Sequence, residues 1–158
     1  MRFEKADDRD IARLIDLRLA YLTEDLGQID EREAALLAER LRDYFERNLN
    51  ARVFAYAARE GEEIVSCALL LVVEKPASPA FPTGNTGMVL NVYTKPEYRR
   101  KGYARRVMNL LLADADRMGL DPIELKATGS GRRLYRTVGF EDADQRYRLM
   151  RRRSPAES

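Results

Sequence analysis

The stretch YRRKGYARRV, residues 98–107, decides the fold, because it lies where an extended segment gives way to a helical pattern. Five cations crowd around the expected helix start: Arg99, Arg100, Lys101, Arg105 and Arg106. The first turn of a helix already has free amides and about half a positive charge, so each uncompensated cation costs roughly 0.3–1 kcal/mol there. A bound anion reverses the sign of that cost, and Gly102 has no side chain to block its approach. The stretch therefore predicts a site for a polyphosphate.

Two interpretations of this stretch stay open from the residues alone. One is the polyphosphate site, and the other is a solvated basic helix start in which Gly102 only serves the turn. The stretch has neither the GxxxxGK[ST] spacing of a nucleotide P-loop nor the GxGxxG of a dinucleotide-binding fold. The rest of the chain has to decide between them.

Apolar spacing on either side of this stretch predicts strands and helices in turn. The expected strands are residues 1–6, 52–60, 64–73, 88–94, 122–127 and 146–150. Helical spacing predicts helices after Asp7 or Asp8, after Asp30 and after Gly102, and a short one within residues 129–140. The prolines and glycines of residues 74–87 indicate a loop long enough to have a function. This order predicts an α/β (α+β) domain whose mixed sheet has helices on both faces.

The composition narrows the possible functions. The 158 residues fit one domain, placed at residues 1–151, with a tail at 152–158 that we expect to be disordered. A net charge of +2 is too small for a chain that binds nucleic acid over its whole surface, and no apolar run is long enough to span a bilayer. Without histidine the chain cannot build a Ser–His–Asp or Cys–His nucleophile, and we expect no metal site. The single cysteine, Cys67, fits a cytoplasmic protein and a buried core position.

Two segments, in this order along the chain, resemble the GNAT superfamily of acyl-coenzyme A-dependent acetyltransferases. Residues 91–108, NVYTKPEYRRKGYARRVM, are similar to its coenzyme signature [QR]-x-x-G-x-[GA], which here is Arg99-x-x-Gly102-x-Ala104. Residues 129–140, GSGRRLYRTVGF, resemble its second segment, which ends in L-Y-x-x-x-G-F. The resemblance implies one domain with a mixed, mostly antiparallel sheet and a splayed pair of strands that admits acetyl-coenzyme A.

The resemblance also implies which residues bind the coenzyme. Its pyrophosphate is expected on the amides of the turn and the first helical residues, here Arg99, Arg100, Lys101, Gly102, Tyr103 and Ala104. Its pantetheine arm is expected on main-chain groups of the preceding strand, here Val92, Tyr93 and Thr94. Many members have an asparagine near the start of the second segment. This chain has KATGSG at residues 126–131, so we expect Thr128 or Ser130 to take its place.

Tyr135 matches the position of the family's general acid, which protonates the departing thiolate. Judged by its own short helix, it is more often a core tyrosine, because Leu134 and Val138 are its neighbours. The matching residues on either side, Leu134 before it and Gly139 after it, favour the catalytic role. No histidine or evident base accompanies Cys67, so direct transfer is expected rather than an acyl-enzyme.

The sequence offers three candidates for orienting the acceptor amine or taking up its proton. Asn91, the one strongly polar side chain of strand 88–94, either orients substrate or a water, or bonds a neighbouring loop. Glu24, beside Asp25, follows the first helix, where relatives build the acceptor site. It either attracts and deprotonates a cationic amine or is a solvated charge at a helix end. A chain of waters to bulk solvent is the third candidate.

The sequence as a whole predicts an N-acetyltransferase that moves an acetyl group from acetyl-coenzyme A to a primary amine of a small molecule or a peptide, in a ternary complex. The alternative is a catalytically silent module that senses acetyl-coenzyme A. Nucleic acid is not an expected partner, because the chain has no series of aromatic residues for stacking, and neither is a membrane. An edge strand such as residues 146–150 could pair two copies into a homodimer.

Overall fold

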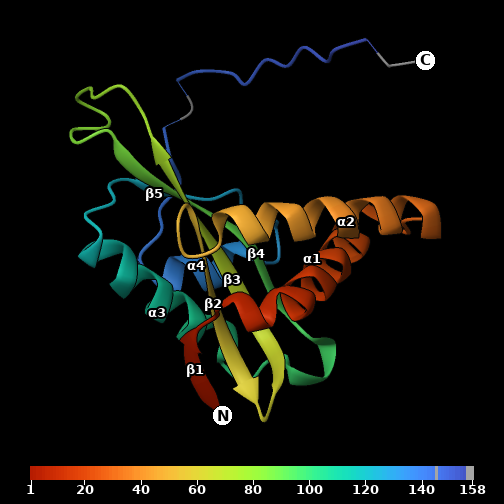
Figure 1. The fold of residues 1–158 in the computed structure, drawn as a ribbon. Coiled ribbons are helices and arrows are strands. Elements are labelled where there is room, and N and C mark those ends of the chain that lie inside the picture. The colour runs from red at the N-terminus through yellow and green to blue at the C-terminus, as the bar shows by residue number, and fades with distance from the viewer. Residues whose placement is uncertain (145, 156–158) are drawn as a thin grey trace.

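The computed structural model describes residues 1–144 and 146–155, and its centre is a sheet of five strands in the order β1-β2-β3-β4-β5 (Figure 1). The strands are β1 (Arg2–Lys5), β2 (Val53–Glu60), β3 (Glu63–Glu74), β4 (Asn85–Thr94) and β5 (Ile123–Glu124). The first four pair antiparallel with their neighbours, and β5 pairs parallel with β4. This arrangement confirms the predicted mixed, mostly antiparallel sheet.

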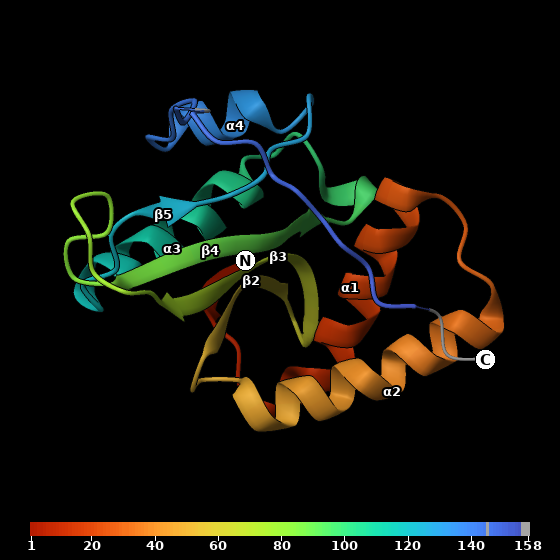
Figure 2. The same ribbon diagram turned by 90° about the horizontal axis from the view of Figure 1, so that it is seen from above.

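Helices cover both faces of the sheet, as predicted (Figure 2). They are α1 (Ile11–Leu26), α2 (Glu31–Asn48), α3 (Tyr103–Arg117) and α4 (Arg132–Thr137). The first two pack on one face through a cluster that includes Leu14 and Phe45, and α3 and α4 pack on the other. Because both faces are covered, β3 is buried without interruption from residue 64 to residue 70.

The caps and periodicities of the sequence account for the helix positions. The Asp30 carboxylate accepts a hydrogen bond from the Glu33 amide at 2.8 Å and so caps α2. The Asp7 carboxylate caps a short 3₁₀ turn, η1 (Asp8–Asp10), which leads directly into α1. In α3, one face of the helix is fully buried and consists of the predicted apolar residues Val107, Met108, Leu111 and Ala115.

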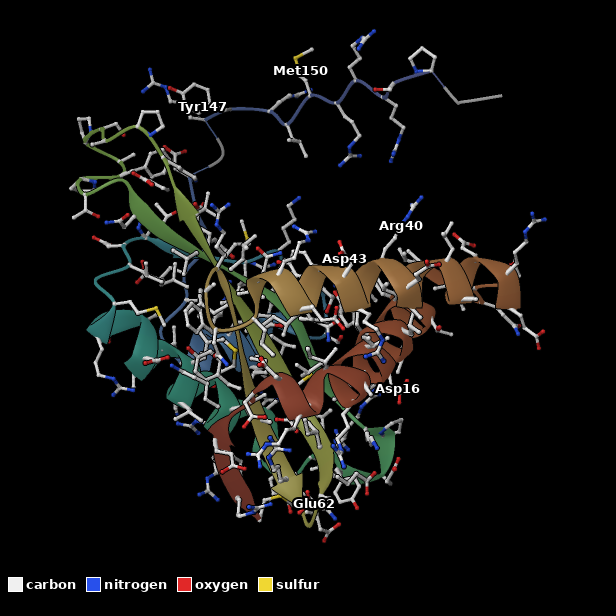
Figure 3. The ribbon with its side chains drawn as sticks, in the orientation of Figure 1. Asp16, Arg40, Asp43, Glu62, Tyr147 and Met150 are labelled. Carbon is white, nitrogen blue, oxygen red and sulfur yellow. The ribbon has the colours of Figure 1, made fainter. Side chains whose placement is uncertain are left out.

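The last two predicted strands differ from the structure. Only Ile123 and Glu124 of the expected strand 122–127 pair with β4, at Gly87 and Met88. Residues 146–150 do not form a strand, and Tyr147 and Met150 are 82% and 90% exposed on a segment that runs clear of the sheet (Figure 3). The physical reason is that β5 offers a ladder of two residues, which is too short to receive a further strand. The expected tail at 152–158 lies partly outside the described residues.

β4 begins three residues earlier than predicted, at Asn85, so the preceding loop is shorter than the sequence suggested. Within the described residues, no helix is both long and apolar enough to cross a membrane.

The feature that matters for function is that β4 continues to Thr94, whereas its pairing with β5 stops at Met88. Beyond Met88 the two strands part, as the predicted splayed pair requires.

The pairing of β4 with β5 brings Gly87 of β4 close to neighbouring side chains. A Cβ atom at Gly87 would lie 2.8 Å from Cδ1 of Ile123 and 3.0 Å from Cδ1 of Leu70, so the ends of these two side chains would have to shift. We therefore predict that Gly87→Ala lowers the free energy of unfolding by about 1 kcal/mol through overpacking, because Leu70 is fully buried and has little room to shift. Thermal and denaturant unfolding would measure the change. Gly129→Ala is the matched control, because a Cβ there meets nothing within 4 Å. Equal stability of the two variants would contradict the close approach.

Candidate active site

The gap between β4 and the segment after β5 opens into a cavity of about 1190 Å³. It is lined by β4, the start of α3, the C-terminal half of α1 and residues 125–137. All of the site residues predicted from the sequence line this cavity, except Lys101. The structure thus brings together residues from four segments that are far apart in the chain.

A bulge in β4 shapes the floor of the cavity. Cys67 pairs with Tyr93 and Leu69 pairs with Leu90, so Asn91 and Val92 together face one residue of β3. Asn91 has a φ of +52°, a left-handed conformation that asparagine tolerates better than most side chains. Strain of this kind costs about 1–3 kcal/mol and persists where the surroundings fix it.

The side chain of Asn91 is buried, and its contacts settle part of its role. Its Nδ2 donates to Cys67 Sγ at 3.8 Å, and its Oδ1 accepts from Nη1 of Arg18 at 3.4 Å. Asn91 therefore connects β4 to β3 and α1 rather than to a neighbouring loop. Its position in the cavity wall leaves the substrate-orienting interpretation open.

The start of α3 has the geometry of an anion site. Gly102 is its N-cap residue and has a φ of +80°, which glycine adopts without a steric cost. Within the described residues, no side chain caps the helix, in contrast to α2. The amides of Tyr103 and Ala104 are therefore available to a ligand in the cavity. A polyphosphate fits this site, because its oxygens accept from several amides at once.

The five cations of the opening stretch have different partners. Arg106 lies over the Phe3 ring at 3.8 Å, and Lys101 lies near the Tyr98 ring at 5.5 Å. Neither of these two cations lines the cavity. Arg100 and Arg105 do line it, together with the start of α3. Fewer of the five cations thus face the cavity than the sequence suggests.

Arg99 is held by α1. Its Nη1 and Nη2 donate to the two carboxylate oxygens of Glu24 at 2.9 and 2.6 Å, and its Nε donates to the carbonyl oxygen of Thr94 at 2.8 Å. The hydrogen bonds from Arg99 lower the pKa of the Glu24 carboxyl, with a smaller opposing effect of burial. Glu24 is therefore an ion-paired carboxylate that ties the end of α1 to the end of β4. Its side chain is 51% exposed, so it is also a solvated charge at a helix end, as one of the two interpretations of the sequence had it.

Tyr135 lies in α4 on the wall of the same cavity. Its ring packs edge-on against Phe140 with centroids 6.1 Å apart, so it is in part a core residue. Burial, with a further contribution from nearby Tyr21, raises the pKa of its phenol. Among residues 1–144 and 146–155, no side chain or carbonyl hydrogen-bonds its hydroxyl group. Tyr135 thus retains its proton at neutral pH while remaining free to donate it.

The segment before α4 places two hydroxyls on the cavity wall. Oγ atoms of Thr128 and Ser130 lie 3.3 Å apart, and Thr128 Oγ1 accepts a hydrogen bond from the Gly131 amide at 3.2 Å. Both residues line the cavity where the family pattern has an asparagine. Because the Thr128 hydroxyl already accepts a backbone hydrogen bond, the Ser130 hydroxyl is the more available of the two to a ligand.

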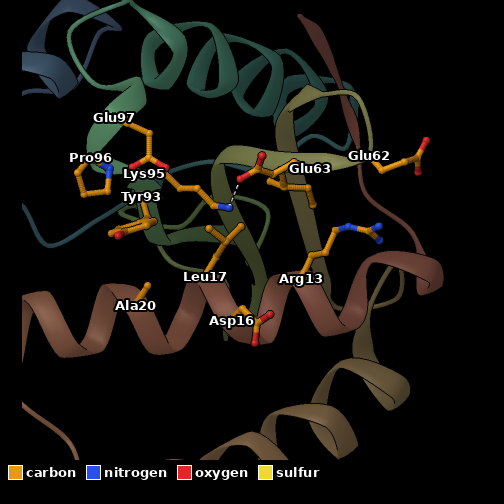
Figure 4. A pocket seen from close by; sticks show the side chains of 11 residues that line it. Arg13, Asp16, Leu17, Ala20, Glu62, Glu63, Tyr93, Lys95, Pro96 and Glu97 are labelled. Carbon is orange, nitrogen blue, oxygen red and sulfur yellow. Dashed lines mark hydrogen bonds and ion pairs between the residues drawn. The ribbon is translucent and has the colours of Figure 1, made fainter.

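A second, smaller cavity of about 600 Å³ lies on the α1 side of Tyr93 (Figure 4). Three of its carboxylates, those of Asp16, Glu62 and Glu97, have no ion-pair partner within the described part of the chain. Lys95, which reaches into it, is paired with Glu63. The unpaired carboxylates make the rim of this cavity acidic, so it does not suit a phosphorylated coenzyme.

Sequence reasoning missed one residue that α1 contributes to the large cavity, Arg18. Arg18, Tyr21 and Asp25 all line it and follow one another at helical spacings of three and four. The available signal was the polar residue Arg18 on the face of α1 that carries the buried Leu14. A helix face that carries both buried apolar residues and a charged residue indicates that part of this face lines a cavity instead of packing against the core.

The comparisons with known proteins agree with this geometry. A model of the acetyltransferase (GNAT) family matches residues 12–140. A protein from Clostridium acetobutylicum, described as a predicted acetyltransferase and solved with acetyl-CoA, is 29% identical with a TM-score of 0.81, over 94% of this chain and 95% of that one. A GCN5-related N-acetyltransferase from Ralstonia eutropha is 24% identical with a TM-score of 0.78, over 94% and 97% of the two chains. A ribosomal-protein-alanine N-acetyltransferase from Brucella melitensis has the same fold, with 20% identity and a TM-score of 0.67 over 96% and 99%. Among curated proteins, no sequence is similar enough to match.

The surroundings of Cys67 yield a prediction about its reactivity. Its side chain is 1% exposed, and burial raises the pKa of the thiol to about 12. We predict that the folded protein resists alkylation by iodoacetamide at mildly alkaline pH, because the reagent needs an exposed thiolate. The denatured protein should react at the ordinary rate. Intact-mass spectrometry over time would measure both, and rapid alkylation of the folded protein would contradict the buried position.

Proposed function

The chain belongs to the GNAT acetyltransferase family, and on that premise we propose that it transfers an acetyl group from acetyl-coenzyme A to a primary amine in a ternary complex. The observation that carries the proposal is that one cavity is lined by three features. These are the uncapped start of α3, the edge of β4 that β5 leaves unpaired after Met88, and the phenol of Tyr135. Each of the three suits one part of the reaction. A metal ion has no role in the proposed step.

The coenzyme is proposed to bind by its phosphates at one end and by its amides along β4. The amides of Gly102, Tyr103 and Ala104, with the guanidinium groups of Arg100 and Arg105, suit the pyrophosphate. Main-chain groups of Val92 and Tyr93 suit the pantetheine arm, because the buried edge of a strand needs hydrogen-bond partners. The carbonyl of Thr94 already accepts from Arg99, so it contributes less to this contact.

In the proposed reaction, the amine nitrogen bonds to the acyl carbon, the carbon–sulfur bond breaks, and the sulfur leaves as a thiolate that takes up a proton. Tyr135 is proposed to donate that proton, and its raised pKa supports this role because the phenol stays protonated through neutral pH. Direct transfer is favoured over an acyl-enzyme, because Cys67 is buried with a strongly raised pKa.

Asn91 and Glu24 are proposed to position groups rather than to accept the amine proton. The Asn91 side chain holds the bulge and contacts Arg18, which places it where a substrate or a water can be oriented. The lowered pKa of Glu24 makes it a weak base, and its oxygens are occupied by Arg99. A water in the cavity is therefore our candidate for the first proton acceptor.

The test is release of free thiol from acetyl-coenzyme A against a broad panel of amines. We expect release that depends on the amine, and we expect Tyr135→Phe to lower kcat by about 100-fold, the lower end of the effect of a general acid. Calorimetry should show unchanged binding of the coenzyme to this variant, because the ring remains. Tyr147→Phe, a change at an exposed site, is the control and should retain full turnover.

Two results would count against this proposal. If the protein binds acetyl-coenzyme A but releases no thiol with any amine, the silent sensor is the better account. If Tyr135→Phe turns over at the rate of the unchanged protein, Tyr135 is a core residue and not the general acid.

A further inference from the structure

One cation in the cavity wall does not belong to the coenzyme end. Arg99 is paired with Glu24, and the remaining basic residues that line the cavity come from the start of α3 and from residues 126–133, on or beside the face that α3 and α4 cover. Arg18 comes from α1, which lies on the opposite face of the sheet (Figure 2). It therefore contributes positive charge to the side from which an acceptor can approach without displacing the coenzyme.

The guanidinium group of Arg18 has donors to spare. It is half-buried, and its one hydrogen bond within the described residues is the long contact of 3.4 Å from Nη1 to Asn91 Oδ1. No carboxylate of residues 1–144 or 146–155 lies within ion-pair distance of it. Arginine has five N–H donors in a planar fork that matches a carboxylate. Arg18 lines the cavity, so the donors that remain on its fork are available to a ligand there.

The acidic residues of the same region do not balance this charge. Both oxygens of Glu24 are taken by Arg99, so Glu24 attracts a cationic acceptor weakly. Asp25 remains, but it is exposed at the end of α1. An acceptor whose only charges are positive would therefore meet the Arg18 charge uncompensated, which disfavours the polyamines as a class.

We propose that the acceptor is an amine with a carboxylate a few bonds from its nitrogen, and that Arg18 binds this carboxylate. The inference rests on the proposed acetyl transfer and adds the chemical class of the acceptor. Arg18 touches Asn91 on the bulge of β4, so a carboxylate paired with Arg18 places its own amine close to the parted strands. A free amino acid has this chemistry, and so does a peptide that begins with an acidic residue.

Paired acceptors that differ only in the carboxylate test the inference. Thiol release would be measured with alanine against alaninamide, and with aspartyl-alaninamide against asparaginyl-alaninamide. The first pair reports a free amino acid, and the second reports a peptide N-terminus. We expect kcat/KM to be about 10- to 100-fold higher for the acid of the preferred pair, as a charge-assisted hydrogen-bonded pair gives.

The variants show whether Arg18 is the source of that preference. Arg18→Gln should bring the ratio of acid to amide close to one, and Arg18→Lys should keep part of it, because the charge remains without the fork. Arg40→Gln, at an exposed site of α2, is the control and should keep the full ratio (Figure 3). A purely structural role for Arg18 would lower both members of a pair together and leave the ratio unchanged.

The outcomes separate this inference from the proposed function. Thiol release that does not distinguish acid from amide in either pair overturns the inference and leaves acetyl transfer standing. The same holds if the preference survives in Arg18→Gln. No thiol release with any amine overturns the proposed function, and the inference falls with it.

Discussion

The start of α3 is the constraint on which the rest of the molecule depends. Its amides have no side-chain cap in the described structure, and Gly102 takes a left-handed conformation that exposes them. Arg100 and Arg105 add positive charge beside those amides, where a helix already repels cations. We propose that an anion with several oxygens offsets this cost. The protein itself accounts for two of the crowded cations, because Glu24 pairs with Arg99 and the Phe3 ring supports Arg106, and the proposed ligand accounts for Arg100 and Arg105.

The second constraint is the end of pairing between β4 and β5. A sheet interior does not tolerate unpaired strand groups, yet the pairing stops at Met88 while β4 continues to Thr94. The bulge at Asn91 turns the strand at this point and is held from the other side by Cys67 and Arg18. The two faces of the sheet are connected here, so a coenzyme bound beside α3 can meet an acceptor bound beside α1.

Local signals predicted most of the fold, and long-range packing explains the errors. Asp30, Gly102 and the apolar stripe of α3 fixed helix positions, because caps and periodicity act over a few residues. The strand expected at residues 146–150 was wrong, because its alternation is correct but β5 offers it too short a partner. The same limit applies to the site. The coenzyme residues lie in contiguous motifs, whereas the pairing of Glu24 with Arg99 and the position of Arg18 depend on how α1 packs against β4, which no local pattern specifies.

The central claim is that linked phosphates bind at the start of α3, and calorimetric titration with coenzyme A at low ionic strength tests it most directly. The account predicts binding that weakens as salt is added, retention of most of it in Gly102→Ala, and its loss in Gly102→Glu. The alanine and glutamate variants share the same backbone strain, so their difference reports the longer, negatively charged side chain. Equal affinity of the glutamate variant and the unchanged protein, or no binding to the unchanged protein, would contradict the account.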